Sequence, residues 1–183
     1  MAVGATMYRI EVALSDVDRG VYETLDVRAA QHPSESMAYL ITRILAYCLE
    51  YAEGVAFSKG LSTTDEPAVW IKDMRGDLVA WIEVGSPSAE RLHKASKASP
   101  RVVVFTQNDP EHVLREARTR AIHRAERIEL YAVPSALLKG IEEKLDRHTK
   151  MELVRTDGQL YVTIGGATLE GTLTRHALRP EDS

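Results

Sequence analysis

Carboxylate side chains that could hold a metal ion gather in one stretch of the sequence. Asp65 and Glu66 precede a β-branched and aromatic run at residues 68–72, and Glu83 lies within a second such run at residues 78–84. Acidic oxygens are the ligands that hard divalent cations prefer in proteins. The pattern therefore predicts a metal site, provided that the two runs lie side by side.

The two runs are separated by a short glycine-bearing loop, Asp73–Gly76, which predicts a β-hairpin. Counting back from this loop in antiparallel register brings Glu66 opposite Glu83, with Asp65 one step away; a one-residue shift would substitute Asp65 for Glu66. Directly opposed residues have Cβ atoms roughly 4.5–5.5 Å apart, where like charges repel. The arrangement therefore favours a divalent cation between the carboxylates.

The acids of this stretch have a second interpretation. Asp65-Glu66-Pro67 also fits a solvated turn whose side chains face water. Glu83 fits that interpretation less well, because an unpaired carboxylate inside an apolar run costs several kcal/mol of desolvation. Glu83 therefore needs a cationic partner or a metal ion.

The segment after Glu83 supplies candidate ammonium groups. Ser86-Pro87 predicts the start of a helix, with the serine as cap and the proline at the first helical position. Lys94 and Lys97 then lie on one flank, from which their amines could reach back toward Glu83. Alternatively, Glu90 and Lys94 form an ordinary surface pair one turn apart.

A long amphipathic helix is predicted over residues 32–53, with Glu35 complementing the positive end of its dipole. Its apolar stripe includes Cys48, so the lone cysteine is expected to be buried and unreactive. Arg43 and Glu50 fall on the other side of the helix, where they are expected to meet solvent; alternatively, either borders a site at the edge of the helix.

A second helix, predicted over residues 111–126, is rich in arginine. One flank is expected to carry Arg120, Arg124 and Arg127, with Arg115 and Arg118 nearby. This basic density either contacts phosphate groups or forms a solvated face balanced by nearby glutamates.

The remaining patterns predict strands and one more helix, and together they favour an α/β fold with a mixed sheet flanked by helices and extra β-hairpins. The residues 102–105 form an unbroken apolar run, typical of a central strand. The predicted elements are a hairpin at residues 5–14 and 22–30, a strand at 101–106, a strand at 129–133, a helix at 136–147, a hairpin at 150–155 and 160–164, and a strand at 168–174.

Composition places the chain among globular proteins and predicts a single domain over residues 1–183. Its 44% hydrophobic and 27% charged content is ordinary, and a net charge of −4 argues against a protein that coats nucleic acid indiscriminately. No apolar stretch approaches the length of a membrane span, and the N-terminal residues lack the pattern of a signal peptide. The expectation is a cytoplasmic protein with no membrane contact.

The order and spacing of several motifs resemble the YaeQ family of bacterial proteins, over nearly the whole chain. These motifs are His32-Pro33-Ser34-Glu35, Arg43, Asp65-Glu66-Pro67 with Trp70, Trp81-Ile82-Glu83-Val84-Gly85, and Arg91 with Lys94. The resemblance implies a variant of the PD-(D/E)XK, or restriction-endonuclease-like, nuclease core, with one acid at the start of a strand and another on the next strand.

The same resemblance implies roles for particular residues. Asp65, Glu66 and Glu83 would bind Mg²⁺ or Mn²⁺, and an acid from the first core helix, Glu35 or less readily Glu50, would join them. The lysine that this superfamily places two residues after the strand acid is Gly85 here. The ammonium group would have to come from Lys94 on the following helix, with Lys97 as the alternate.

Three hypotheses about function follow. The first is a metal-dependent phosphodiester hydrolase acting on DNA or RNA, in which the metal activates water and Lys94 stabilises the phosphate. The second is a catalytically inactive relative with the nuclease fold and a binding or transcription-related role. The third is a structural domain in which an internal arginine or lysine neutralises Glu83.

Overall fold

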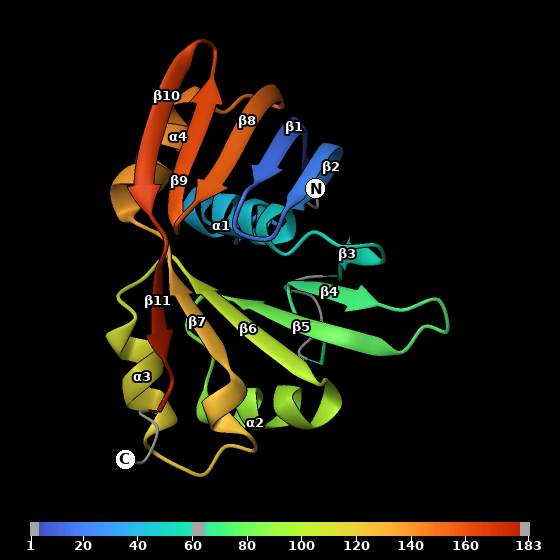
Figure 1. Ribbon diagram of the computed structural model, residues 1–183, viewed down its shortest axis with the longest axis vertical. Coiled ribbons are helices and arrows are strands. Elements are labelled where there is room, and N and C mark those ends of the chain that lie inside the picture. The colour runs from blue at the N-terminus through green and yellow to red at the C-terminus, as the bar shows by residue number, and fades with distance from the viewer. Residues whose placement is uncertain (1–3, 60–64, 180–183) are drawn as a thin grey trace. The chain divides into compact units, whose positions relative to one another are not determined.

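The computed structural model describes residues 4–59 and 65–179, and contacts within the chain divide it into two compact units. Unit 1 combines the described residues up to Leu49 with Val133–Leu173, and unit 2 combines Glu50–Ala132 with those from Thr174 onward. Each unit contains a mixed β-sheet and helices (Figure 1). The expected α/β class is confirmed, with the strands distributed over two sheets.

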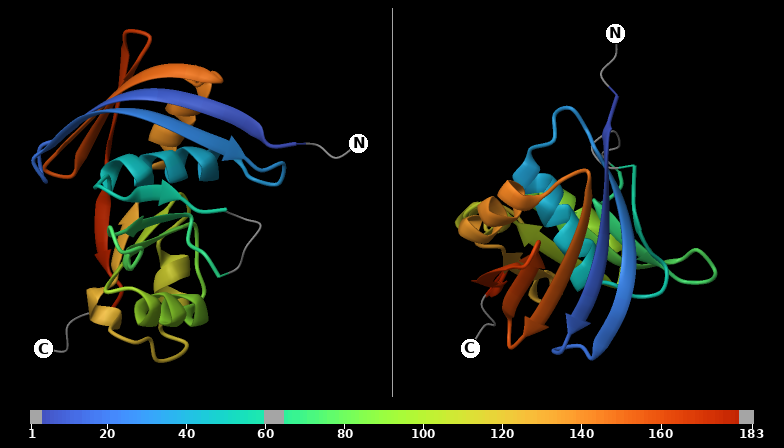
Figure 2. Two further views of the ribbon diagram at one scale, coloured as in Figure 1. Left: turned by 90° about the vertical axis from the view of Figure 1, so that its right-hand side faces the viewer. Right: turned by 90° about the horizontal axis from the view of Figure 1, so that it is seen from above.

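Unit 1 is built on a sheet with the strand order β10-β9-β8-β1-β2. The first two strands pair antiparallel, and β1 pairs parallel with β8. Figure 2 shows this sheet arching over α1. Its elements are β1 (Thr6–Asp16), β2 (Val21–Gln31), α1 (Met37–Leu49), α4 (Ser135–Lys144), β8 (His148–Thr156), β9 (Gln159–Ile164) and β10 (Ala167–Thr172).

Alternation along the strands builds the core of unit 1. Val12 and Leu14 of β1 and Val27 of β2 are buried, whereas their neighbours along each strand are more exposed. Leu40 and Ile44 of α1 are also buried. The predicted hairpins at both ends of this unit are thus confirmed.

The turn between β1 and β2 does more than reverse the chain. Asp18 accepts hydrogen bonds from the backbone N–H groups of Asp157, at 2.7 Å, and Gly158, at 3.0 Å, in the β8–β9 turn. Asp16 is fully buried and pairs with Arg19 at 2.7 Å. The hydrogen bond from Gly158 lowers the pKa of Asp18, assisted by Asp157 and Arg155 against the effect of burial. Asp16 is the last residue of β1, whereas Asp18 lies in the turn and joins the two hairpins.

The first helix starts later than predicted, at Met37. The side chain of Ser36 accepts the backbone N–H of Tyr39 at 3.1 Å, so Ser36 caps the helix, and the preceding residues form a turn. Glu35 therefore lies before the helix. The expectation that Arg43 meets solvent is wrong, because Arg43 is 6% exposed and pairs with Glu35.

Unit 2 is built on a sheet with the strand order β11-β7-β6-β5-β4-β3. The central strands β5, β6 and β7 are parallel, and β4 pairs antiparallel with β5. Its elements are β3 (Val55–Phe57), β4 (Val69–Lys72), β5 (Leu78–Val84), α2 (Ala89–Ala98), β6 (Arg101–Thr106), α3 (Glu111–Ala117), the 3₁₀ turn η2 (Ala125–Arg127), β7 (Glu129–Ala132) and β11 (Thr174–Ala177).

The predicted central strand at residues 101–106 is confirmed as β6, with Val103, Val104 and Phe105 fully buried. One face of the sheet packs on α2 and α3 through Val102, Val104 and apolar residues of both helices. The crossover from β5 to β6 runs through α2, which is the usual way to join parallel strands.

The hairpin of β4 and β5 forms, but its predicted register is wrong. Val69 pairs with Ile82 and Lys72 pairs with Leu78, with an irregularity between Ile71 and Lys72. The Asp73 side chain closes a longer loop by accepting the N–H groups of Arg75 and Asp77, each at 2.9 Å. Glu66 therefore precedes β4 and does not pair with Glu83.

Two helix predictions in unit 2 also need correction. The cap of α2 is Ser88, whose hydroxyl accepts the Arg91 N–H at 3.1 Å, so the helix begins at Ala89 and not at Pro87. The arginine-rich helix ends at Ala117, and the rest of its predicted length is a loop followed by η2. No helix in residues 4–59 or 65–179 is long and apolar enough to cross a membrane.

Candidate functional site

Glu83 lies near the end of β5, on the sheet face that also carries Trp81 and packs on α2. It is only 4% exposed although it is an acid. Its two oxygens accept hydrogen bonds from the Trp81 indole, at 2.6 Å, and from Arg91 Nε, which lies 2.9 Å from both oxygens. The carboxylate that the sequence singled out is therefore neutralised by an arginine.

Arg91 joins three parts of unit 2. Its backbone N–H is held by Ser88, its Nε binds the Glu83 carboxylate, and its Nη2 donates to the backbone oxygen of Glu66 at 2.6 Å. The guanidinium carbon also lies 5.9 Å from the centre of the Trp81 ring. Because a guanidinium presents several donors in a fixed plane, one side chain can fix β5, α2 and the segment before β4.

The segment before β4, which carries Asp65 and Glu66, contacts this group through its backbone. Asp65 is exposed, and Glu66 is half-buried. The Glu66 carboxylate accepts the backbone N–H of Lys59 at 3.1 Å. Arg91 thus holds the Asp65-Glu66 segment close to Glu83. The predicted strand pairing, which would place the Glu66 and Glu83 carboxylates directly opposite each other, does not occur.

The predicted lysines take a different place from Arg91. Lys94 and Lys97 are both exposed on α2. The ion pair of Glu90 is with Arg120, at 4.0 Å on the surface. The cation that contacts Glu83 is therefore Arg91, one turn before Lys94.

The backbone at Gly85 explains why no lysine stands there. Gly85 has φ of 101°, in the left-handed region that a lysine adopts only with strain, and its N–H donates to Phe105 at 2.9 Å. The position two residues after the strand acid is thus a tight turn between β5 and α2.

Glu35 belongs to unit 1 and has a partner of its own there. Arg43 donates to both Glu35 oxygens, at 2.9 and 3.0 Å, and to the backbone oxygen of Ala30 at 2.8 Å. Glu35 also accepts the His32 N–H at 3.2 Å. The His32-Pro33-Ser34-Glu35 motif thus forms a closed turn between β2 and α1.

Glu50, the less favoured helix acid, is 4% exposed, so the expectation that it meets solvent is wrong. Arg101 at the start of β6 binds Glu50 and also Glu129, the latter at 2.9 Å. Burial opposes the charge of Arg101, but the hydrogen bond and charge of Glu50 and those of Glu129 raise its pKa. This group is a second arginine-centred network within unit 2.

The arrangement of acids does not match a metal centre as it stands. Within residues 4–59 and 65–179, no group of three or more His, Cys, Asp or Glu side chains is placed to hold a metal ion. The carboxylate oxygens of Glu83 are already bound by Arg91 and Trp81. A divalent cation would fit there only if Arg91 moved away.

Sequence reasoning missed the partners of Glu83. Arg91 entered only as a part of a family motif, and Trp81 only as an apolar strand residue. Two signals pointed to them: the demand of a buried acid for a cation, and the position of Trp81 two residues before Glu83, which puts both on one face of a strand.

Comparison with known proteins identifies a family of α/β proteins to which this geometry belongs. The profile of the family described as YaeQ protein matches residues 1–173, and the chain belongs to this family. The uncharacterised protein YaeQ of Escherichia coli is 29% identical over 177 residues, covering 95% of this chain and 97% of that relative. YaeQ of Salmonella typhi is 27% identical over 175 residues, covering 95% and 97%.

Solved structures of the same family share the fold. The crystal structure of YaeQ from Pseudomonas syringae aligns with a TM-score of 0.82 and 31% identity, covering 97% of each chain. That of YaeQ from Xanthomonas axonopodis pv. citri aligns with a TM-score of 0.83 and 29% identity, covering 93% of this chain and 96% of the other. The two-sheet architecture is therefore shared with these bacterial proteins.

Proposed function

We propose that this protein binds nucleic acid on a nuclease-like scaffold without metal-dependent turnover. The observation that carries the proposal is the closed group of Glu83, Arg91 and Trp81. The Glu83 carboxylate is held by the Arg91 guanidinium, whereas a metal-dependent nuclease would hold a metal ion at this acid. Glu83 then acts as a structural ion-pair member that fixes α2 against the sheet.

The order of elements in unit 2 supports the scaffold. Strands β3, β4 and β5 form an antiparallel meander, and α2 then leads to β6, which is parallel to β5. Together with an acid before one strand and an acid on the next, this order agrees with the PD-(D/E)XK core that the motifs resemble. A shared fold does not determine chemistry, so the function rests on the site.

The second candidate is a metal-dependent phosphodiester hydrolase. It is favoured by the Arg91 contact to the Glu66 backbone, which keeps the Asp65-Glu66 segment close to Glu83. In that case Asp65, Glu66 and Glu83 bind Mg²⁺ or Mn²⁺, and Lys94 or Lys97 contacts the phosphate. This arrangement requires Arg91 to release Glu83, and Glu35 would remain with Arg43.

One assay separates the two candidates. A fluorescently labelled mixed-sequence oligonucleotide, as DNA or RNA and as single strand or duplex, is incubated with the protein with and without Mg²⁺ or Mn²⁺. Each sample is read twice, by anisotropy for binding and on a denaturing gel for length.

We expect a rise in anisotropy and an intact oligonucleotide under all metal conditions. Metal-dependent shortening that is lost in Glu83→Gln and reduced by about 10²–10³-fold in Lys94→Ala would establish the hydrolase instead. Absence of binding to every oligonucleotide would refute the proposed function.

A further inference from the structure

The surface of unit 2 around the segment Arg115–Arg127 has an unusual charge. This segment contains five arginines and two glutamates, a formal charge of +3, whereas the rest of the chain has 18 cationic and 25 acidic residues and carries −7. All five arginines are exposed. Positive charge is therefore concentrated in one short part of an otherwise acidic protein.

The acids near these arginines neutralise little of that charge. Glu116 is directed to the start of α2, where its carboxylate accepts the Ala89 N–H at 3.3 Å. Glu90 pairs with Arg120 at 4.0 Å, with both side chains more than half exposed, and such pairs are weak. Within the described part of the chain, no ion pair within 4.0 Å involves Arg118, Arg124 or Arg127.

The backbone that carries the arginines is fixed to its surroundings. His93 of α2 accepts the His123 N–H at 3.0 Å, and Ser96 donates to the His123 backbone oxygen. Arg179 donates to the backbone oxygens of Ala117, at 3.0 Å, and Arg120, at 2.7 Å. The loop is thus held from both sides by hydrogen bonds.

Apolar side chains of the same loop complete the attachment. Ile122, Ala125 and Ile128 are buried in the core that packs against α2 and α3. Arg124 lies between them with φ of 49° and ψ of 42°, a left-handed conformation that is uncommon for a residue with a side chain. The surroundings hold this backbone, and a held backbone lowers the entropy lost when a ligand binds.

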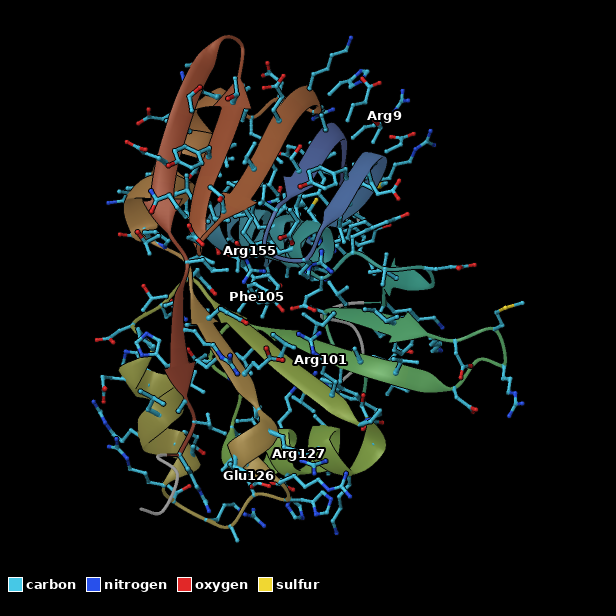
Figure 3. The ribbon with its side chains drawn as sticks, in the orientation of Figure 1. Arg9, Arg101, Phe105, Glu126, Arg127 and Arg155 are labelled. Atoms are coloured by element: carbon cyan, nitrogen blue, oxygen red, sulfur yellow. The ribbon has the colours of Figure 1, made fainter. Side chains whose placement is uncertain are left out.

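The contacts of α2 define where the surface continues. Glu90, His93 and Ser96 are the helix residues that meet the loop, and Lys97 follows His93 by one turn on the same flank. Lys97 is exposed. Arg127 lies at the end of unit 2 that carries α2 (Figure 3). The arginines that follow α3 therefore form one surface with Lys97, called the basic surface below. These arginines are Arg118, Arg120, Arg124 and Arg127.

From this arrangement we propose that the basic surface binds the sugar-phosphate backbone of nucleic acid. The inference rests on the proposed function and specifies where the nucleic acid lies. Guanidinium groups match phosphate oxygens with two parallel hydrogen bonds, and contacts to phosphate position a protein without reading sequence. The acidic remainder of the chain repels the same ligand, so binding is directed to this face.

The experiment uses the full chain and a labelled mixed-sequence oligonucleotide, as single strand and as duplex. The first variant replaces Arg118, Arg124 and Arg127 together by glutamine. The second is Arg124→Gly, which removes one charge while relieving the left-handed backbone. The matched control is Arg28→Gln, because the Arg28 side chain is 65% exposed and lies in unit 1.

Binding is measured by anisotropy as salt rises from about 50 to 200 mM, because each phosphate contact contributes about 0.7 to 0.9 to the slope of log affinity against log salt. We expect the triple variant to lose about two to three units of that slope and Arg124→Gly to lose a little under one. Arg28→Gln should keep the wild-type slope. Circular dichroism of each variant confirms the fold.

The outcomes separate this inference from the proposed function. If the wild type binds and both arginine variants retain its affinity and slope, the basic surface is refuted while nucleic-acid binding stands. If Arg28→Gln weakens binding as much as Arg124→Gly, the contact is not localised and the inference fails. If the wild type binds no oligonucleotide, or binds anionic phospholipid vesicles through the same arginines with no preference for nucleic acid, both proposals fail.

Discussion

The chemistry of a single residue, Glu83, decides between the functional alternatives. An acid inside an apolar strand must be neutralised, and either a metal ion or a cationic side chain can do this. Arg91 reaches both carboxylate oxygens and the Glu66 backbone at once, which a lysine with one ammonium could not do. The third sequence hypothesis, an internal cation at Glu83, therefore describes the observed contacts.

The first prediction concerns the Glu83–Arg91 pair. Arg91→Met leaves a buried carboxylate without its cation and should lower the free energy of unfolding by about 3 kcal/mol. Adding Glu83→Gln should restore part of this loss, because the uncompensated charge disappears. Urea unfolding of the two single variants and the double variant measures the coupling.

Lys94→Ala is the matched control, since Lys94 lies on the same helix and is exposed. It should change stability by less than about 0.5 kcal/mol. If Arg91→Met and Lys94→Ala change the free energy of unfolding equally, the contact between Arg91 and Glu83 contributes nothing to stability.

The second prediction concerns Cys48. Burial raises the pKa of its thiol to about 12, so the thiolate needed for reaction is almost absent at neutral pH. A thiol reagent should therefore label the native protein slowly and the urea-unfolded protein rapidly. Rapid native labelling would show that Cys48 is accessible.

At the scale of elements, the sequence predicted the kinds of structure better than their boundaries. The hairpins, the central strand β6 and the buried stripe of α1 follow from alternation, an apolar run and a helical period. The β4–β5 register did not follow, because the irregularity between Ile71 and Lys72 and the Asp73 turn shift the pairing. Local periodicity carries no signal for either feature.

Long-range partners were the other features that the sequence could not supply. The acids Glu35, Glu50 and Glu83 were recognised as candidates, but their cations lie 8, 51 and 8 residues away. Helical position alone puts Arg43 and Glu50 on the polar side of the predicted helix at residues 32–53, which predicts that both meet solvent. Side chains that reach back to another element reverse such an assignment.

The third prediction tests the turn between β5 and α2. Because Gly85 has φ of 101°, Gly85→Lys should lower stability by about 1–2 kcal/mol and should create no metal-dependent cleavage. Ala98→Lys adds the same charge at an exposed position of α2 and should be close to neutral. A stable Gly85→Lys protein that cleaves nucleic acid would show that the missing lysine is the sole defect.

The fourth prediction tests the link between the two hairpins of unit 1. The folded-state pKa of Asp18 is lowered, chiefly by its hydrogen bond from Gly158, so its stabilising effect is complete above the unfolded pKa of about 3.9 and is lost as pH falls through the folded pKa. Asp18→Asn should cost roughly 0.5–1 kcal/mol at pH 7, after allowance for solvent screening.

The difference between wild type and Asp18→Asn should shrink as pH falls below about 4. Thermal unfolding across this pH range measures it. A difference that stays constant with pH would mean that the charge of Asp18 does not take part.

At the scale of the whole molecule, charge and family membership bear on function in different ways. The chain shares its fold with other YaeQ proteins over nearly its full length, which accounts for the scaffold. The separation of a +3 segment from a −7 remainder belongs to the sequence itself. The nucleic-acid ligand that we propose would account for that separation, and the scaffold alone does not require it.

Arg91 contacts both carboxylate oxygens of Glu83, and we predict that a metal ion does not take its place. Calorimetric titration of the wild-type protein with Mn²⁺ tests this most directly, with Glu83→Gln as the matched variant because it preserves shape and removes the charge. We predict no binding isotherm that depends on Glu83. A stoichiometric isotherm in the wild type that disappears in Glu83→Gln would contradict the claim and establish Glu83 as a metal ligand.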